Sequence, residues 1–227
     1  MKADLSIIVT SYNKTPQQIE ECFQSIRDQT VRPREVILVD DGSTSPRAHA
    51  DAISILLPKN NGVAVARDVG VRMSLGSLLL FVDADDKLAP DFIEQCGKEI
   101  ANCDISYPNV VLFGDIEINT SAPSPKELNP EDLMNRSCKI VVTSMMHRHV
   151  YNKLGGFQDL PVYEDWDFWI RAMYCGYKFR QANTLLWYRQ SPKSRNQISN
   201  EIRLDTYNRI TAPYRVEEGR ICLKQTG

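Results

Sequence analysis

An acidic run at residues 83–86 (Asp-Ala-Asp-Asp) directly follows the apolar stretch 78–82 (LLLFV). The carboxylates of Asp83, Asp85 and Asp86 repel one another, so the run is unfavourable unless a cation or a proton enters. Mg²⁺ and Mn²⁺ prefer one or two carboxylates together with phosphate oxygens and water, and an Asp-x-Asp turn can offer these beside a diphosphate. On the residues alone, the run predicts either such a metal-diphosphate site or a solvated acidic turn.

Two further polar clusters follow apolar, β-branched stretches. Ser11-Tyr12-Asn13 comes after residues 5–10, and Asp40-Asp41-Gly42-Ser43 comes after residues 35–39. In a doubly wound parallel sheet, ligands bind beyond the carboxyl ends of the strands. Three clusters in equivalent positions therefore indicate one ligand-binding edge, although Asp40 and Asp41 are also typical residues for capping a turn.

The pattern that positions these clusters alternates strands with helices. Thr15, Pro16 and Gln18 predict a capped helix start, and the stripe Ile19, Cys22, Phe23 and Ile26 would face the sheet. We expect strands at residues 5–10, 35–39, 53–57 and 78–82, and a second helix at residues 63–75. The first half thus predicts a β-α-β-α-β-α-β order, with a further helix between residues 35–39 and 53–57, and a mostly parallel, doubly wound α/β sheet.

The second half is less regular. Residues 104–113 and 139–146 have the composition of strands, and the polar stretch 114–130 predicts a surface loop. A short helix is expected from Pro130, and a longer one at residues 164–174, ending before Gly176. The longer helix would begin with Glu164 and Asp165, two acids that on the residues alone compensate the helix dipole.

The composition is that of an ordinary soluble enzyme and excludes several classes of protein. The 227 residues suit one domain, and the net charge of −2 gives no general attraction to nucleic acid or anionic lipid. Six cysteines without a Cys-x-x-Cys pair indicate neither a zinc knuckle nor a redox motif. Because no signal-peptide stretch or long apolar window occurs, we expect a cytoplasmic protein without a membrane anchor of its own.

Four runs in order, SIIVTSYNK, EVILVDDGS, NNGVAVARDVGVRMSLG and FVDADDKLAPDF, resemble the inverting family 2 glycosyltransferases, including the spore-coat polysaccharide type. TSMMHRHVYNKLGGF and YEDWDFWIRA continue the resemblance. It implies a Rossmann-like GT-A fold with an abutting acceptor-side lobe. Residues 1–227 would form a single GT-A domain, with 1–103 binding the nucleotide sugar and 104–227 binding the acceptor and supplying the catalytic base.

On the donor side, the resemblance implies that Thr10, Tyr12 and Asn13 surround the nucleotide base, with Tyr12 stacking on it. Asp41 would accept the imide hydrogen of uracil. Cytosine presents an acceptor at the corresponding nitrogen, so a carboxylate there would favour a UDP-sugar.

The same resemblance implies roles for the acidic run. Asp83 would hydrogen-bond the donor ribose beside Ala84, and Asp85 would ligate Mn²⁺ or Mg²⁺ through the diphosphate, whereas Asp86 either stabilises the turn or touches the ion. Arg67 would contact the donor, or form a salt bridge to Asp83 or Asp85.

On the acceptor side, the resemblance assigns Asp165 as the base that deprotonates the acceptor hydroxyl and Glu164 as the residue that orients it or binds the acceptor. Trp166, in preference to Trp169, would stack against a sugar, the alternative being a core position. His147 would approach the phosphates or metal, the alternative being a satisfied, partly buried histidine.

One position departs from the family. A histidine often follows a Tyr-Arg pair near the end of the family's core, but here Tyr188-Arg189 is followed by Gln190, so that segment is expected to do no more than contact the donor. Lys193, Ser194 and Arg195 have the composition of a mobile flap.

Two rival functions share the scaffold: a non-catalytic domain that binds a sugar nucleotide or glycan, and a nucleotidyltransferase. Retention of Asp85 and Asp165 argues against the first, and the lack of glycines in SYNKTP argues against the second. The partners implied are a nucleotide-sugar donor and a hydroxyl-bearing acceptor, most naturally a glycan. The sequence leaves open the donor sugar, the acceptor and the oligomeric state.

Overall fold

A computed structural model of the chain describes residues 2–114, 121–122, 128–135, 140–190 and 198–224. Its main elements in the first half are β1 (Leu5–Ser11), α1 (Pro16–Arg27), β2 (Glu35–Asp40), β3 (Ile53–Leu56), α2 (Val63–Arg72), β4 (Leu78–Asp83), β5 (Lys87–Leu88) and α3 (Phe92–Ile100). In the second half they are β6 (Ile105–Gly114), β7 (Ser121–Ala122), α4 (Pro130–Met134), β8 (Met145–His147), α5 (Arg148–Leu154), α6 (Glu164–Tyr174), β9 (Phe179–Gln190), α7 (Asn200–Thr211), β10 (Tyr214–Glu217) and β11 (Arg220–Leu223).

The first half forms the parallel part of the sheet, in the order β3-β2-β1-β4. Ile8 in β1 pairs with Ile37 in β2 and with Phe81 in β4, and all three side chains are fully buried. Because both faces are covered, these strands are mostly apolar, as predicted. The polar clusters that follow β1, β2 and β4 consequently meet at one edge.

The expected helix between the second and third strands is absent. Residues 41–52 join β2 to the parallel strand β3 without a helical turn. This segment consists largely of turn formers and contains Pro46, so it lacks the apolar stripe that would pack a helix on the sheet. The order in the first half is therefore β-α-β-β-α-β.

The second half extends the same sheet in the order β8-β6-β9-β5. β8 pairs antiparallel with both β4 and β6, whereas β9 runs parallel to β6. The expected strand at residues 139–146 is only Met145–His147 among the described residues, and α5 follows it at once. The predicted strand at 104–113 and the helix at 164–174 are confirmed, as is the mixed α/β fold class.

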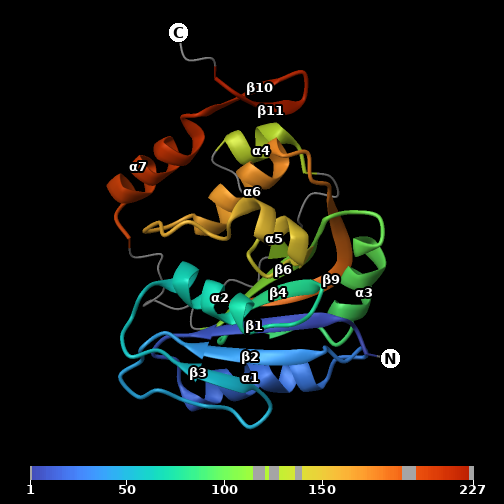
Figure 1. The fold of residues 1–227 in the computed structure, drawn as a ribbon, viewed down its shortest axis with the longest axis vertical. Coiled ribbons are helices and arrows are strands. Elements are labelled where there is room, and N and C mark those ends of the chain that lie inside the picture. The colour runs from blue at the N-terminus through green and yellow to red at the C-terminus, as the bar shows by residue number, and fades with distance from the viewer. Residues whose placement is uncertain (1, 115–120, 123–127, 136–139, 191–197, 225–227) are drawn as a thin grey trace.

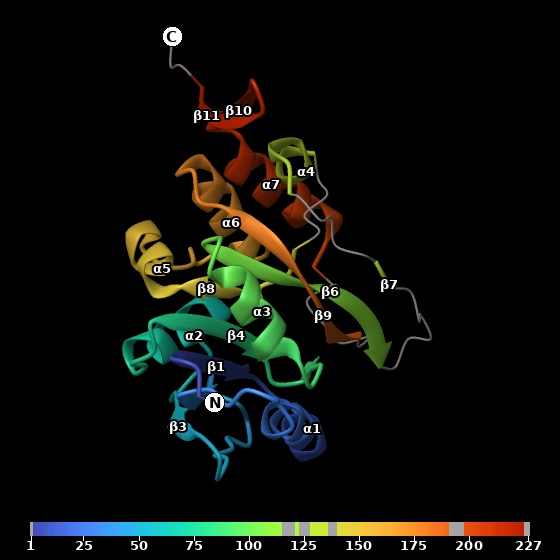
Figure 2. The ribbon, with the colours of Figure 1, turned by 90° about the vertical axis from the view of Figure 1, so that its right-hand side faces the viewer.

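Helices cover both faces of the sheet (Figures 1 and 2). α1 and α3 pack against Ile7 and Val9, whereas α5 and α6 belong to the core that contains Ile8. The predicted capping box at Thr15 is present, since Gln18 N donates to Thr15 Oγ1 at 3.2 Å and Thr15 N donates to Gln18 Oε1 at 2.9 Å.

α2 lies very close to β1. A Cβ atom on Gly70 would sit 2.4 Å from Ile8 Cγ2, so only glycine allows this approach. From the second turn of this helix, Arg67 reaches Asp83 at the end of β4. α2 ends at Arg72, three residues before the predicted end.

The C-terminal elements α7, β10 and β11 lie at the end of the molecule opposite β2 and β3 (Figures 1 and 2). Ile210 of α7 and Ile221 of β11 join the core that contains α6, so these elements pack on the fold. None of the described helices has both the length and the apolar character needed to cross a bilayer.

Candidate active site

Each carboxylate of the acidic run has a different partner. Asp83 Oδ1 accepts hydrogen bonds from Thr10 Oγ1 and Arg67 Nη2, both at 3.2 Å. Asp85 Oδ2 pairs with Lys14 Nζ at 2.5 Å. Asp86 is buried. It accepts a hydrogen bond from the backbone N–H of β9 residue Arg189 at 2.8 Å. This bond identifies Asp86 as a residue that ties β9 to the acidic turn, one of the two roles predicted for it.

The partners shift the carboxyl groups in opposite directions. Burial alone would raise the pKa of Asp83, but the positive charges of Arg67 and Lys14 and the hydrogen bonds lower it below the usual value. Burial raises the pKa of Asp86 well above its usual value, with the negative charges of Asp83 and Asp85 adding to the effect. Asp83 is therefore the charged member of this pair.

The turn after β2 is fixed by its own carboxylates. Asp40 Oδ1 accepts a hydrogen bond from Ser43 N at 2.8 Å, which is the capping role foreseen for it. The oxygens of Asp41 accept from Asn61 N at 2.9 Å and from Gly62 N at 3.0 Å, so Asp41 joins this turn to the start of α2. Each oxygen of Asp41 therefore accepts one backbone hydrogen already, and the imide N–H of uracil would donate to a remaining lone pair of this carboxylate.

Gly42 allows the same turn to approach the segment before α2. Its φ is 70°, and a Cβ atom there would lie within 2.1 to 2.5 Å of the backbone of Lys59 and Asn60. No other residue fits without moving backbone, so the glycine of the DDGS run is required sterically.

The end of β1 supplies the remaining predicted donor residues. Thr10 is buried, whereas Tyr12 has 47% of its surface exposed and offers a free ring face. Asn13 has a positive φ of 52° and is held by Ser43 Oγ, which accepts from its N–H at 2.8 Å. Ala84 is fully buried and donates its N–H to the carbonyl oxygen of Thr10 at 3.0 Å, which aligns the two strand ends.

Arg67 connects the two halves of the chain. Its guanidinium donates to Asp83 at the end of β4 and, at 2.8 Å, to Glu164 Oε1 at the start of α6. Arg67 is 2% exposed, and burial of this charge is compensated by the surrounding carboxylates of Asp83, Glu164 and Asp165, which raise the pKa of Arg67. The predicted salt bridge to Asp83 is confirmed, and the pair with Glu164 was not foreseen.

Asp165 has the electrostatic properties of a proton acceptor. Burial raises the pKa of its carboxyl group to about 7, with the negative charge of Glu164 adding to the effect and that of Arg67 opposing it. Its Oδ1 accepts a hydrogen bond from the N–H of Trp166 at 2.8 Å, which fixes the side chain against the first turn of α6. A general base works best when its pKa lies near the operating pH.

Asp83 and Asp165 line one cleft of about 450 Å³. Residues from both halves of the chain form its wall: Val63, Arg67, Asp83, Ile140, Val141, Val142, Val162, Tyr163, Glu164, Asp165, Trp166, Tyr188 and Arg203. The cleft thus joins the carboxyl end of β4 to the start of α6.

Tyr188 of β9 lies among the acids of this region. Burial raises the pKa of its hydroxyl, and the charges of Asp83, Asp86, Asp165 and Asp85 each raise it further. The negative charges of the acidic run and of Asp165 therefore act together on this one hydroxyl. Asp85 does not line the 450 Å³ cleft itself, but it is two residues from Asp83 and its charge acts on Tyr188, and both of these residues line the cleft.

The aromatic predictions divide as follows. Trp169 is fully buried in the core, the alternative considered for it. Trp166 lines the cleft but is 5% exposed, and its indole N–H donates to the carbonyl oxygen of Leu133 at 2.8 Å. This hydrogen bond holds α4 against α6. Because the ring is almost fully buried, little of its surface is accessible to a sugar.

His147 does not lie with the other predicted residues. It pairs with Leu78 at the start of β4, whereas the acidic run follows the end of that strand. β8 runs antiparallel to β4, so the chain leaves the site as it approaches His147. The residues before β8, Ile140 to Val142, line the cleft instead. The position of His147 therefore contradicts its assignment to the acceptor side, and its Nε2 lies 3.3 Å from the carbonyl oxygen of Ile100.

Sequence reasoning missed Lys14 and Arg203. Lys14 stands directly after the SYN cluster, but a single lysine carries no recognisable signal until folding places it on Asp85. Arg203 lies on α7 and contacts Tyr163 OH at 3.3 Å across the cleft wall. The flap predicted at Lys193, Ser194 and Arg195 lies outside the described residues.

The donor set fits a divalent cation that shares its ligands with a diphosphate. Among the described residues, no group of three or more His, Cys, Asp or Glu side chains forms a metal cage. Asp85, however, offers a carboxylate that already attracts an ammonium group, which stands in for a cation. An ion held there by one carboxylate would need phosphate oxygens and water for its other positions, as Mg²⁺ prefers.

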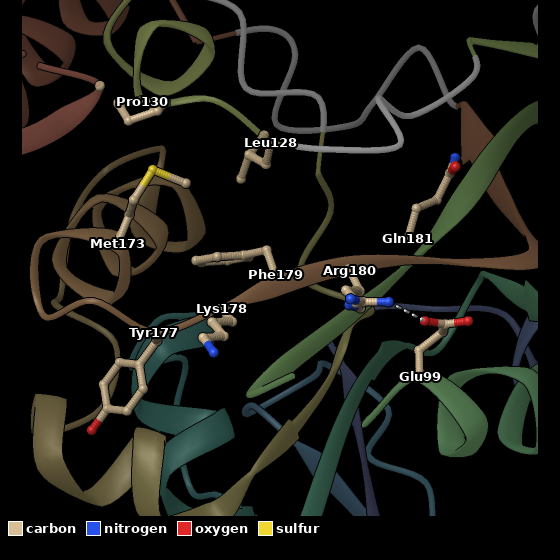
Figure 3. A pocket seen from close by; sticks show the side chains of 10 residues that line it. Glu99, Leu128, Pro130, Met173, Tyr177, Lys178, Phe179, Arg180 and Gln181 are labelled. Atoms are coloured by element: carbon tan, nitrogen blue, oxygen red, sulfur yellow. Dashed lines mark ion pairs between the residues drawn. The ribbon is translucent and has the colours of Figure 1, made fainter. Parts of the chain in front are cut away.

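A larger cavity, of about 510 Å³, lies away from these acids (Figure 3). Its wall includes Phe179 and Arg180 at the start of β9 and Met173 of α6, and Arg180 pairs with Glu99 of α3 at 3.8 Å. Tyr188 lies near the other end of β9. Size alone therefore does not identify the site in this protein.

Comparisons with known sequences find relatives that are described as glycosyltransferases. The sequence profile described as Glycosyl transferase family 2 matches residues 6–155. The uncharacterized glycosyltransferase YwdF of Bacillus subtilis is 32% identical over 183 residues, which cover 74% of this chain and 67% of YwdF. The amylovoran biosynthesis glycosyltransferase AmsE of Erwinia amylovora is 27% identical over 98% of this chain and 87% of its own.

Solved structures show the same fold. TarS of S. aureus in complex with UDP-GlcNAc matches with a TM-score of 0.71 at 18% identity, over 94% of this chain and 68% of that one. The complex of TarS with UDP matches with a TM-score of 0.65 at 22% identity, and this chain spans 61% of its length. At these identities the likeness establishes the architecture of the sheet and its helices.

Proposed function

The chain belongs to glycosyl transferase family 2, and on that premise we propose that it transfers a sugar from a UDP-sugar to an acceptor hydroxyl by a single displacement with inversion, assisted by Mn²⁺ or Mg²⁺ at Asp85. The observation that carries this proposal is the shared cleft of Asp83 and Asp165, two carboxyl groups whose pKa values are shifted in opposite directions. Such a pair provides one group that remains charged and one that takes up a proton.

Asp165 is the proton acceptor in this proposal. It takes the proton of the acceptor hydroxyl as that oxygen attacks the anomeric carbon from the face opposite the leaving diphosphate. Glu164, anchored by Arg67, raises the proton affinity of Asp165 and keeps the first turn of α6 in place. The proton acceptor is therefore positioned by an ion pair that reaches back to the donor side.

On the donor side, Thr10 and Arg67 orient the carboxylate of Asp83 toward the ribose of the donor. Tyr12 offers its exposed ring to uracil, and Asp41 accepts the imide hydrogen. A divalent ion, when bound at Asp85, neutralises the charge that grows on the leaving diphosphate. The acceptor is a glycan hydroxyl in this proposal, and the apolar segment Ile140 to Val142 forms the wall beside it.

A panel of nucleotide sugars incubated with the protein and a divalent ion tests the proposal. We expect hydrolysis or transfer to release UDP from a UDP-sugar, and the anomeric configuration of a transferred sugar, measured by NMR, to be inverted. Asp85→Asn should lose activity, whereas Asp205→Asn, which removes an exposed acid on α7, should not.

Three outcomes would contradict parts of the proposal. Release of pyrophosphate would point to a nucleotidyltransferase. Tight UDP-sugar binding without turnover, tested across acceptors, would point to a binding domain. Full activity in a chelator would remove the metal from the mechanism.

A further inference from the structure

A lysine occupies the position where the proposed function requires a metal ion. Lys14 follows β1 and Asp85 follows β4, and the fold brings Lys14 Nζ to 2.5 Å from Asp85 Oδ2. The side chain of Asp85 is 10% exposed and that of Lys14 is 31% exposed, so solvent reaches the pair on the side of Lys14. Among the described residues, Lys14 provides the salt bridge to this carboxylate.

The charge of Lys14 acts on the whole acidic run. It contributes to lowering the pKa of Asp83, and it partly offsets the rise in the pKa of Asp86. The ammonium group therefore lies where the negative potential of the run is concentrated. Lysine suits this position because its charge sits on a flexible four-carbon chain that can swing away, unlike a guanidinium fixed by two hydrogen bonds.

We infer that Lys14 is an internal counter-ion that holds the cation position on Asp85 until a divalent ion and a nucleoside diphosphate bind together. The inference rests on the proposed function, because it concerns the same ion and the same donor. Its consequence is that each of the two ligands strengthens the binding of the other.

The physical reason is charge balance. Lys14 and Asp85 neutralise each other, so an ion that binds alone must displace the ammonium group and leave it close to a new positive charge. A diphosphate brings negative charge to the same place and compensates both cations. Positive coupling between ion and diphosphate follows, and by linkage the coupling is the same whichever ligand binds first.

Isothermal titration calorimetry, with Mn²⁺ titrated into the protein in the absence and in the presence of UDP, measures this coupling. In the wild type we expect weak Mn²⁺ binding alone and a clear gain in affinity with UDP. In Lys14→Met we expect Mn²⁺ alone to bind about tenfold more tightly, and the gain from UDP to shrink by a similar factor. Lys87→Met removes the same charge from β5, where Lys87 lies over the ring of Phe113, and should leave the coupling unchanged.

The titration separates this inference from the proposed function. Suppose that Asp85→Asn abolishes Mn²⁺ binding, whereas Lys14→Met changes neither the affinity for Mn²⁺ without UDP nor the gain in affinity from UDP. The role of Lys14 as a counter-ion is then wrong, and the metal site at Asp85 is supported. If neither the wild type nor Lys14→Met binds Mn²⁺ even with UDP, the metal in the proposed function is wrong as well. Lys14→Gln removes the charge and keeps a polar side chain. The same titrations are made with this variant if Lys14→Met does not fold.

Discussion

Asp83 and Asp165 line the same cleft, Asp83 in the wall at the end of β4 and Asp165 in the wall at the start of α6, and their surroundings shift their pKa values in opposite directions. Asp83 ends β4 beside two positive charges, Arg67 and Lys14, and its pKa is lowered. Asp165 begins α6 beside the negative charge of Glu164, and burial raises its pKa to about 7. In the proposed function, one residue type thus provides a charged donor-side group and a proton acceptor, and the neighbours decide which.

Arg67 makes the contrast possible, because it belongs to both walls. It pairs with Asp83 on one side and with Glu164 on the other, at 3.2 and 2.8 Å. The donor side is built from sheet ends held by backbone hydrogen bonds, whereas the acceptor side is a helix start at which the buried Arg67 pairs with Glu164. The acceptor side should therefore be the more sensitive to substitution.

The largest expected effect is on the proton acceptor. Asp165→Asn should lower the rate of sugar transfer by about 10²- to 10⁴-fold, because a positioned base contributes that much. The amide oxygen of asparagine can still accept from Trp166 N, so the affinity for UDP should remain within about twofold. Steady-state transfer rates and UDP titrations measure the two effects. Normal turnover with weakened UDP binding would contradict the assignment of Asp165 as the proton acceptor and would place it on the donor side.

Removal of the cation between the walls should affect both. Arg67→Met leaves the buried Glu164 and the half-buried Asp83 without their ion-pair partner, and the free energy of unfolding should fall by about 3–5 kcal/mol. Because Arg67 opposes the rise in the pKa of Asp165, that pKa should also move upward. Chemical denaturation and a pH-rate profile measure these changes.

The matched control for this variant lies on the same helix. Arg72→Met breaks an exposed pair with Asp68 and should cost less than about 1 kcal/mol. Equal losses in the two variants would mean that Arg67 has no special role between the walls.

A smaller effect is expected at the donor-side turn. Both oxygens of Asp41 accept backbone hydrogens, so Asp41→Asn turns an N–H donor toward another donor. The free energy of unfolding should fall by about 1–3 kcal/mol, and UDP should bind more weakly. Calorimetry and UDP titration measure both. Unchanged UDP affinity at temperatures where the variant is folded would exclude Asp41 from base recognition.

The smallest effect concerns pH. Transfer, as kcat/KM, should rise through an apparent pKa of about 7 as Asp165 loses its proton. Between the ordinary aspartate pKa of 3.8 and about 7, the native state binds a proton that the unfolded state releases, so this group makes the protein less stable as pH rises through that window. Asp165→Asn should therefore flatten the fall in unfolding free energy above pH 4, as measured by denaturation at several pH values. A profile that is flat from pH 5 to 8 in the wild type would argue against a raised pKa.

Much of the fold could be predicted from local patterns. The apolar β-branched stretches fixed β1, β2 and β4, and the Thr15 capping box fixed the start of α1, because these signals depend on neighbours in the chain. The segment at residues 41–52 failed this reasoning, since a β-α-β expectation was applied where no helical stripe exists. The strand predicted at residues 139–146 was longer than β8, and α5 was not predicted. The length of β8 depends on its pairing with β4 and β6, which are distant in sequence.

The sequence by itself determined which side chains could carry charge and that three polar clusters would share the edge of a parallel sheet, because strand direction follows from the order of the elements. Only the tertiary structure decided that Arg67 reaches Glu164 across 97 positions, that Lys14 rests on Asp85, and that His147 lies at the wrong end of β4. It also set the proton affinity of Asp165. Long-range electrostatics depend on distance and burial in space, and the linear chain contains neither.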